Sequence, residues 1–202
     1  MSPRAPPSNA TIVGVLLAAG LGRRYDPTGE CLKLLQPVLA GKHAGAPNVA
    51  AAARNLSAVV ERVIAVVRPR DHPHQAQLHD LLQRDGCELV ICERASDGMG
   101  ASLACGINAS ANAVTWVIAL GDMPAIDPDT GIAVADALRA GYATTAPTYR
   151  RERGHPVGFS ARCLVELQKC GADHGARAVF EMHPPHLLAV DDAGILIDID
   201  HR

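Results

Sequence analysis

The residues from 17 to 24, Leu-Ala-Ala-Gly-Leu-Gly-Arg-Arg, follow an apolar stretch and have the composition of a phosphate-binding loop. The two glycines let the backbone come close to a ligand, and the two alanines keep large side chains out of the way. Arg23, Arg24 and, further on, Lys33 supply positive charge. Backbone N–H groups together with cations are what a polyphosphate needs. An ordinary strand-to-helix turn with solvated arginines has the same composition, so this loop alone leaves both interpretations open.

Two common nucleotide-binding patterns do not fit this loop. The Walker pattern, a glycine-rich loop that ends in Gly-Lys-Ser or Gly-Lys-Thr, is absent. The dinucleotide-binding pattern fails at its third glycine, whose place is taken by Tyr25. The next apolar stretch ends in Val67, Arg68 and Pro69, without the acidic residue that would bind a ribose. These departures argue against a nicotinamide-dependent oxidoreductase.

Asp122 is the second candidate for chemistry. It lies in the sequence Leu-Gly-Asp-Met-Pro at 120–124, directly after another apolar stretch, and Gly121 and Pro124 fix the turn around it. A carboxylate in this position can hold Mg²⁺, a hard cation that prefers oxygen ligands and usually bridges to phosphates. A turn-forming or helix-capping aspartate is the alternative interpretation, because aspartate is frequent in such turns.

Apolar runs and helical periodicity predict the elements that position these residues. Strands are expected at 11–17, 63–67, 88–92, 114–120, 142–149, 155–159, 187–190 and 195–199, and helices at 48–60, 71–85, 99–112, 127–140, 162–169 and 176–181. Strands that alternate with helices pair in parallel and form a layered α/β sheet. Ligands bind such sheets beyond the carboxyl ends of the strands, where the loops after Leu17 and Leu120 lie.

Length and composition narrow the class of protein. A chain of 202 residues fits one domain, expected over 11–202 after a disordered, proline-rich tail at 1–10. Hydrophobic residues make up 48% of the chain, which excludes a disordered protein, while a net charge of −2 and 3% aromatic residues argue against nucleic acid as a partner. No apolar stretch approaches the ~18 residues needed to span a membrane. The six cysteines have no metal-binding spacing and fit a reducing cytoplasm.

Six short motifs, in order along the chain, resemble the MobA-like nucleotidyltransferases and, within them, the molybdenum cofactor cytidylyltransferases. They are LLAAGLGRR at 16–24 with Lys-Leu-Leu at 33–35, DGMGASL at 97–103, LGDMP at 120–124, RGHPVGF at 153–159, DHGAR at 173–177 and DID at 198–200. The resemblance covers roughly residues 11–200. It implies a single three-layer, Rossmann-like α/β domain with a mostly parallel central sheet, of the nucleotide-diphospho-sugar transferase type, in agreement with the predicted strands and helices.

The resemblance also implies roles for individual residues. The catalytic residues would be Arg23, Lys33 and Asp122. Ligands of a Mg²⁺ cofactor would be Asp122 and, as a second contact, Asp198 or Asp200. The nucleotide would be bound by Leu17, Ala18, Ala19, Gly20, Gly22, Arg24, Gly98, Met99 and Ser102. The acceptor of the nucleotidyl group would lie against His155, Asp173 and Arg177.

Two features depart from the family's pattern. The link between Arg24 and Lys33 contains residues 25–32, which is longer than the usual arginine-methionine-glycine link, and this bears on the position of Lys33. The family usually continues after the motif at 198–200 with threonine, proline and acidic residues. Here His201 and Arg202 follow, which bears on the second metal contact.

The reaction implied by the resemblance is the transfer of CMP from CTP onto molybdopterin, or onto the molybdenum–molybdopterin cofactor, with release of pyrophosphate. The Leu-Ala-Ala-Gly form of the loop and His155 in Gly-His-Pro point to CTP. A molybdoenzyme or its chaperone is an expected protein partner. Two alternatives stay open: a guanylyltransferase or another NTP transferase acting on a small phosphate such as a sugar phosphate, and a non-catalytic carrier of the cofactor or nucleotide.

Overall fold

Strand β1 (Ile12–Leu17) lies in the middle of the sheet, between β2 (Arg62–Val67) and β4 (Thr115–Leu120), and both pairings are parallel. Strand β3 (Glu88–Ile91) pairs in parallel with β2. The structure is a computed structural model that describes residues 11–171 and 175–199. Leu17 is in register with both Val66 and Leu120, so these three strands end at the same edge of the sheet. The loops that were predicted to carry the site begin at this edge.

The other side of the sheet mixes the two strand directions. Strand β7 (Val157–Ser160) runs antiparallel to β4, and β5 (Thr144–Tyr149) runs antiparallel to β7. Strand β8 (His186–Ala189) pairs in parallel with β5, and the short β6 (Glu152–Arg153) pairs antiparallel with it. Within the described residues the order is β3-β2-β1-β4-β7-β5-β6, with β8 beside β5. The predicted α/β fold with a mostly parallel central sheet is confirmed.

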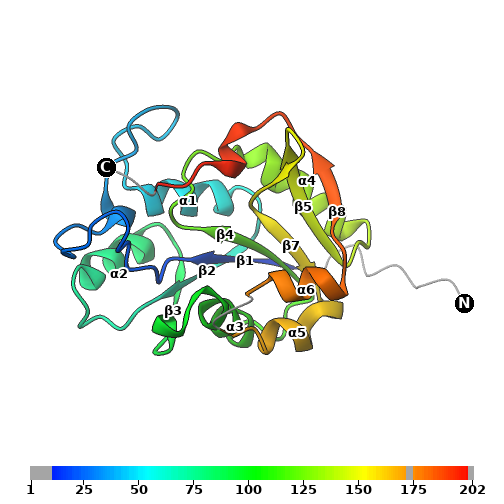
Figure 1. The fold of residues 1–202 in the computed structure, drawn as a ribbon, viewed down its shortest axis with the longest axis horizontal. Coiled ribbons are helices and arrows are strands. Elements are labelled where there is room, and N and C mark those ends of the chain that lie inside the picture. The colour runs from blue at the N-terminus through cyan, green and yellow to red at the C-terminus, as the bar shows by residue number, and fades with distance from the viewer. Residues whose placement is uncertain (1–10, 172–174, 200–202) are drawn as a thin grey trace, which may run out of the picture.

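Helices cover both faces of the sheet and complete three layers (Figure 1). On one face lie α1 (Asn48–Ser57), α2 (Gln75–Arg84) and α4 (Pro128–Arg139). On the other lie α3 (Met99–Ala109), α5 (Leu164–Gln168) and α6 (Arg177–Met182). Strand β1 is apolar throughout because both of its faces are covered: Ile12 and Leu16 pack into the first helical layer, and Val13 and Val15 into the second.

The ends of the helices follow from local chemistry. Helix α4 begins as predicted, because the Asp127 carboxylate accepts a hydrogen bond from the Asp129 N–H at 3.0 Å and Pro128 occupies the first helical position. The helix predicted at 71–85 begins only at Gln75. The residue before it, His74, has a φ of 65°, which belongs to a turn and cannot continue a helix.

The structure differs from the sequence prediction in two places, near β5 and at the end of the chain. The strand predicted at 195–199 is wrong: a short 3₁₀ helix (Ala193–Leu196) occupies its start, and residues 197–199 form no strand. The Asp192 carboxylate accepts a hydrogen bond from the Gly194 N–H at 2.9 Å and turns the chain there. Strand β6 was not predicted, because its turn uses Arg150 and Arg151 at positive φ in place of the usual asparagine and glycine.

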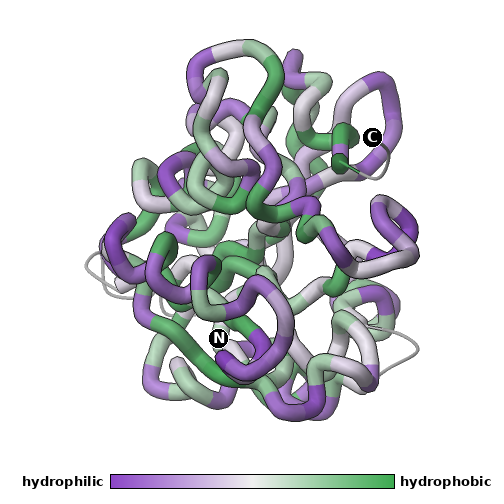
Figure 2. The backbone as a smooth tube through the Cα atoms, turned by 90° about the vertical axis from the view of Figure 1, so that its left-hand side faces the viewer, coloured by the Kyte–Doolittle hydropathy of each residue, from purple (hydrophilic) through white to green (hydrophobic). Residues whose placement is uncertain are grey.

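The hydropathy of the backbone follows this layered arrangement. Figure 2 shows hydrophobic and hydrophilic residues alternating along the helical segments, as expected for helices that pack one side onto a sheet. In the part of the chain that the structure describes, no helix combines the length and the apolar composition needed to cross a bilayer.

Candidate active site

Lys33 and Asp122 form an ion pair at the carboxyl edge of the central strands. The Nζ atom of Lys33 lies 2.6 Å from Oδ2 of Asp122, and the two side chains are 10% and 21% exposed. Asp122 is the second residue after β4, and the Gly121 N–H donates to the Leu17 carbonyl at 3.0 Å, which ties its loop to the end of β1. The pair therefore joins the loops that follow two neighbouring strands.

Lys33 reaches this position although the link before it is long. It opens a short 3₁₀ helix (Lys33–Leu35), and the Asn48 side chain at the start of α1 donates to the Lys33 carbonyl at 2.9 Å. Gly22 packs against the Lys33 side chain: a Cβ atom there would lie 3.2 Å from Cγ of Lys33. Gly22 also has a φ of 63°, a conformation that disfavours other residues. The glycine loop and Lys33 thus form one packed unit.

A cavity of about 270 Å³ opens beside this ion pair, and we call it the strand-end cavity. It gathers predicted residues from the loops after β1, β3 and β4, namely Leu17, Ala19, Gly20, Lys33, Gly98, Met99, Ser102 and Asp122. Four further residues that were not predicted also line it, namely Leu34, Arg68, Ala95 and Leu120. The structure thus brings residues of these distant motifs to the wall of one cavity.

Four predicted residues of the glycine loop lie elsewhere. Ala18 is fully buried in the core, and its N–H donates to the Val66 carbonyl at 2.9 Å. Gly22 lies behind Lys33. Arg23 lines a neighbouring cavity, and the exposed Arg24 is among the lining residues of neither cavity. The loop therefore divides its residues between packing and the two cavities.

The start of helix α3 faces the strand-end cavity and adds to its positive potential. Met99 is the first residue of the helix, and Gly98 before it has a φ of 114°. The first N–H groups of a helix lack partners within the helix, and the helix dipole makes this end favourable for negative charge. Gly98, Met99 and Ser102 line the cavity from this end. The cavity therefore combines a helix N-terminus, Lys33 and the carboxylate of Asp122.

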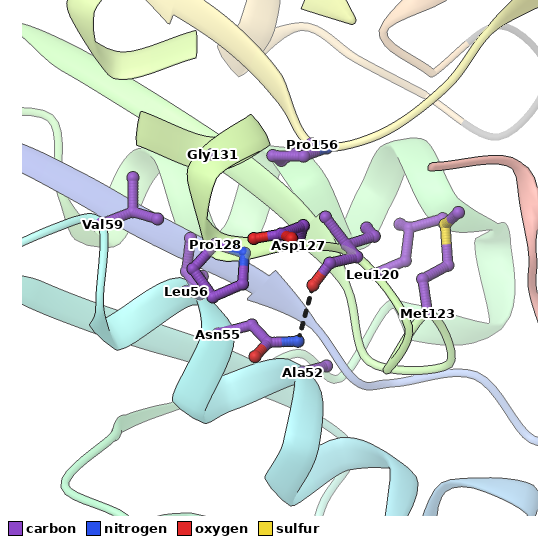
Figure 3. Close-up of a pocket in the computed structure, with 12 residues that line it drawn as sticks. Ala52, Asn55, Leu56, Val59, Leu120, Met123, Asp127, Pro128, Gly131 and Pro156 are labelled. Carbon is purple, nitrogen blue, oxygen red and sulfur yellow. Dashed lines mark hydrogen bonds between the residues drawn. The ribbon is translucent and has the colours of Figure 1, made fainter. Parts of the chain in front are cut away.

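The side chain of Asn55 in α1 holds the turn that carries Asp122. Its Nδ2 donates to the carbonyls of Pro124 at 3.1 Å and Ile126 at 2.9 Å, and its Oδ1 lies 2.7 Å from Nε2 of His43. Figure 3 shows Asn55 pointing from its helix toward this loop, beside a small cavity of about 20 Å³. Met123 of the same turn is buried against this cavity. The backbone around Asp122 is thereby fixed on both sides.

The predicted acceptor residues divide between the site and the surface. His155 donates its backbone N–H to the Ile195 carbonyl at 3.1 Å and precedes a cis peptide bond to Pro156. Burial lowers the pKa of its imidazole, and the hydrogen bond to the Ile118 backbone and the charge of Asp122 oppose this shift only in part. Arg177 is exposed on α6, 3.6 Å from Glu181, and does not line the strand-end cavity. Asp173 lies outside the described residues.

The last described residues meet the Asp122 turn. The Ile199 N–H donates to the Asp122 carbonyl at 3.0 Å. Asp198, a predicted metal contact, is exposed next to this bond, and Asp200 lies outside the described residues. This hydrogen bond brings the end of the chain to the predicted metal ligand.

Arg68 is the main residue of the site that sequence reasoning missed. It follows β2 and is only 5% exposed, and it lines the strand-end cavity. Its Nε donates to the Ala19 carbonyl at 2.7 Å and its Nη1 to Oγ of Ser96 at 3.0 Å. The sequence held a signal, because a basic residue directly after a parallel strand next to β1 lies at the same edge as the glycine loop.

The family of the chain follows from comparison with known sequences. Residues 14–187 match the family model described as MobA-like NTP transferase domain, which places the chain among nucleotidyltransferases. The chain therefore belongs to the MobA-like NTP transferase family. No curated protein sequence matches the chain.

Solved structures share the fold over nearly the whole chain. Rv0371c from Mycobacterium tuberculosis H37Rv is 26% identical, with a TM-score of 0.75, over 95% of this chain and 93% of that one, and it has also been solved with manganese. A nucleotidyl transferase from Methanothermobacter thermautotroptrophicus is 22% identical, with a TM-score of 0.75, over 95% and 92%. A molybdopterin-guanine dinucleotide biosynthesis protein A from Archaeoglobus fulgidus is 16% identical, with a TM-score of 0.58, over 88% and 82%. The last two show the fold alone.

Proposed function

We propose that the chain is a Mg²⁺-dependent cytidylyltransferase that moves CMP from CTP onto molybdopterin or its molybdenum form and releases pyrophosphate. The observation that carries this proposal is the strand-end cavity, in which the glycine loop, the start of α3 and the Lys33–Asp122 pair face one space. Its family supplies the nucleoside triphosphate as substrate class. The choice of CTP and molybdopterin rests on the resemblance of the 16–24 and 153–159 motifs to cytidylyltransferases.

The Asp122 carboxylate fits a divalent cation. It offers oxygen ligands at the wall of a cavity and already has a cationic group, Nζ of Lys33, 2.6 Å away. Mg²⁺ is usually held by one or two carboxylates together with phosphate oxygens of the substrate, so one well-placed aspartate suffices. When bound, the ion would neutralise charge on the phosphates. Asp198 is the second proposed ligand within the described residues, because its neighbour Ile199 bonds to Asp122.

The chain's own residues then position and neutralise the reacting groups. A phosphate oxygen of the acceptor attacks the α-phosphorus, a new P–O bond forms, and the bond to the β-phosphate breaks with its electron pair leaving on pyrophosphate. The attacking phosphate is already anionic, so the site needs no strong base. Lys33, Arg23 and the free N–H groups at the start of α3 offset the negative charge, and most of the rate gain comes from positioning and electrostatics.

The acceptor is proposed to lie on the β7 side of Asp122. His155 is the described residue that supports this placement, because the charge of Asp122 acts on its imidazole and opposes the lowering of its pKa by burial. A neutral imidazole in this place can accept or donate a hydrogen bond to the acceptor. Arg177 and Asp173 remain proposals from the sequence alone.

Calorimetric binding of CTP, GTP, ATP and UTP, each with and without Mg²⁺, tests the nucleotide. A Mg²⁺-dependent preference for CTP, followed by pyrophosphate release with molybdopterin, is the expected result. A preference for GTP would move the chain to the guanylyl branch, and a preference for ATP or UTP would redirect the search to other small phosphates. Tight binding of a nucleotide without pyrophosphate release from any acceptor would favour the carrier alternative.

A further inference from the structure

Cys92 and Cys105 bring two free thiol groups into direct contact near the strand-end cavity. The Sγ atom of Cys105 lies 2.6 Å from Sγ of Cys92, which in turn lies 3.7 Å from the Ala101 carbonyl. Within the described residues, which include all six cysteines, this is the one hydrogen bond between two thiols. A disulfide bond joins its sulfur atoms at about 2.05 Å, so the two thiols already lie near bonding distance.

The pair joins the end of β3 to the middle of α3, which lie side by side (Figure 1). Cys92 directly follows β3, and its N–H donates to the Val67 carbonyl at 2.8 Å, which continues the pairing of β3 with β2. Cys105 lies within α3 next to Gly106. Gly106 lets the helix approach the sheet closely, because a Cβ atom there would lie 2.6 Å from Cγ1 of Val15. The central sheet therefore fixes the positions of both cysteines.

The segment between the two cysteines forms one wall of the strand-end cavity. Four residues of this segment line the cavity, namely Ala95, Gly98, Met99 and Ser102. After β3 the chain makes a short 3₁₀ helix (Ala95–Asp97), passes Gly98 at a φ of 114° and enters α3. A covalent bond between the end of β3 and α3 would close a loop around this segment. Loop closure reduces the number of conformations that the enclosed chain can adopt when it opens or unfolds.

The two thiols differ in their access to solvent. Cys92 is fully buried, whereas Cys105 is partly exposed, so a reagent from solution reaches Cys105 first. Burial and the hydrogen bond with Cys92 raise the pKa of the Cys105 thiol, and the positive charge of Arg94 opposes this shift. A small thiolate fraction makes oxidation slow at neutral pH, and a thiol with a high pKa is also a poor leaving group when the disulfide is reduced. The pair therefore suits slow and lasting oxidation.

We propose that Cys92 and Cys105 form a reversible dithiol–disulfide pair, which a hydroperoxide oxidises and which fastens the 95–102 wall of the strand-end cavity. The Cys105 sulfur attacks one oxygen of hydrogen peroxide, an S–O bond forms, and the O–O bond breaks. The departing oxygen takes the thiol proton and leaves as water, so Cys105 becomes a sulfenic acid. The Cys92 sulfur then attacks the Cys105 sulfur, the S–S bond forms, and the S–O bond breaks with loss of a second water that carries the Cys92 proton. The two sulfur atoms together lose two electrons, and the peroxide gains them.

The test treats the reduced protein with hydrogen peroxide and maps its tryptic peptides without reduction. Cys92 lies in the peptide 85–94 and Cys105 in the peptide 95–139. The expected product is a covalent pair of these two peptides with two hydrogen atoms fewer than the separate peptides, and dithiothreitol should separate it again. Because Cys87 shares the first peptide, the Cys87→Ser variant must still form this product.

Cysteine variants test which thiols react. Cys105→Ser removes the thiol that the peroxide reaches first, so the linked peptides should disappear. Cys170→Ser is the matched control, because Cys170 is also partly exposed but its Sγ lies 3.2 Å from the Gly175 carbonyl and not beside a second thiol. This control should form the linked peptides as the wild type does. If Cys105→Ser does not fold, Cys105→Ala tests the same loss with an apolar side chain.

Hydrogen exchange of the amide groups in residues 95–104 measures the fastening of the wall. We expect exchange there to be at least about threefold slower in the oxidised wild type than in the reduced protein, because the bridge restricts local opening. The midpoint of urea unfolding should also rise on oxidation, since the closed loop constrains the unfolded chain. Oxidised Cys105→Ser should show neither change.

Three outcomes would overturn the inference. The first is the absence of linked peptides even at about pH 9, where more of the thiol is ionised. The second is linked peptides that persist in Cys105→Ser. The third is a disulfide that leaves both the exchange rate and the urea midpoint unchanged. This inference does not rest on the proposed function, because nucleotide binding and pyrophosphate release by the reduced protein test that function separately.

Discussion

Lys33 and Asp122 form an ion pair in the wall of the strand-end cavity, with Nζ and Oδ2 2.6 Å apart. Under the proposed function these two groups have separate tasks, since Lys33 binds phosphate and Asp122 binds the divalent cation. A nucleotide that arrives with its metal must therefore exchange this ion pair for two new ones. The pair keeps both side chains at the site before the ligand binds, and it sets up a competition that can be measured.

We expect Lys33→Met to separate metal binding from nucleotide binding. Removal of the ammonium group frees the Asp122 carboxylate, so Mn²⁺ should bind the protein alone about tenfold more tightly, equivalent to ~1.4 kcal/mol. The same change removes a phosphate contact and should weaken CTP binding by at least about tenfold. Electron paramagnetic resonance of free Mn²⁺ and calorimetry of CTP measure the two effects. Lys42→Met, at an exposed position, is the control; weaker Mn²⁺ binding in Lys33→Met would contradict the competition.

Asp122→Asn should abolish the metal-dependent reaction while the fold persists. The substitution keeps the size of the side chain but removes the charge that binds the cation, so pyrophosphate release should fall at least about 100-fold. It also removes the ion pair of Asp122 with Lys33, whose side chain is 10% exposed. The free energy of unfolding should drop by about 2 kcal/mol, less than the ~3–5 kcal/mol for a fully buried pair.

The matched control for that variant is Asp136→Asn. Asp136 pairs with Arg139 on the surface of α4, and its side chain is 64% exposed. Turnover and stability of this control should stay close to the wild type, because exposed ion pairs contribute little. Turnover by Asp122→Asn within a factor of a few of the control would exclude Asp122 as the metal ligand.

Asn55→Ala should disturb the site, because Asn55 supports the turn that carries Asp122. The Asn55 amide donates to the carbonyls of Pro124 and Ile126, and both hydrogen bonds are buried. Loss of the amide leaves two buried acceptors unsatisfied, which should lower the free energy of unfolding by about 2–3 kcal/mol. The Asp122 turn should also loosen, so kcat should fall more than nucleotide affinity. Urea unfolding and steady-state kinetics test both effects.

Ser57→Ala, near the end of the same helix, is the control. A loss of stability without any loss of kcat would show that Asn55 only supports the fold.

The central part of the fold could be predicted because its physical signals are local. Strand β1 is apolar on both faces and lies between two helical layers, so its run of aliphatic residues identifies a buried parallel strand. The register of Leu17 with Leu120 then brings the glycine loop and Asp122 together, as the rule for strand ends requires. Lys33 was placed from the family motif, and its packing on Gly22 explains why the long link before it does not displace it.

The missed features depend on contacts between distant segments. Arg68 belongs to the site because its hydrogen bonds to the Ala19 carbonyl and to Ser96 hold it there. The sequence Val-Arg-Pro does not reveal those neighbours. The strand predicted at 195–199 has the right apolar residues, but Asp192 turns the chain before it can pair. The second cavity, which Arg23 lines, likewise forms only because the segments 25–32 and 68–74 lie opposite each other, and the composition of the chain does not reveal that they are close.

His155 should make the stability of the protein depend on pH below neutrality. Burial lowers the pKa of its imidazole below the usual value of about 6.5, with a further lowering by Arg153. The unfolded chain therefore binds a proton at a pH where folded His155 does not, so the free energy of unfolding must decrease as pH falls below about 6.5. This loss continues until the pH reaches the lowered pKa of the folded state.

Urea unfolding at pH 7.5, 6.5 and 5.5 measures this dependence. We expect the free energy of unfolding to decrease less for His155→Gln than for the wild type as the pH falls. His72→Gln, at an exposed position, should keep the wild-type slope. Equal slopes in all three proteins would mean that His155 takes up its proton as readily in the folded state as in the unfolded chain.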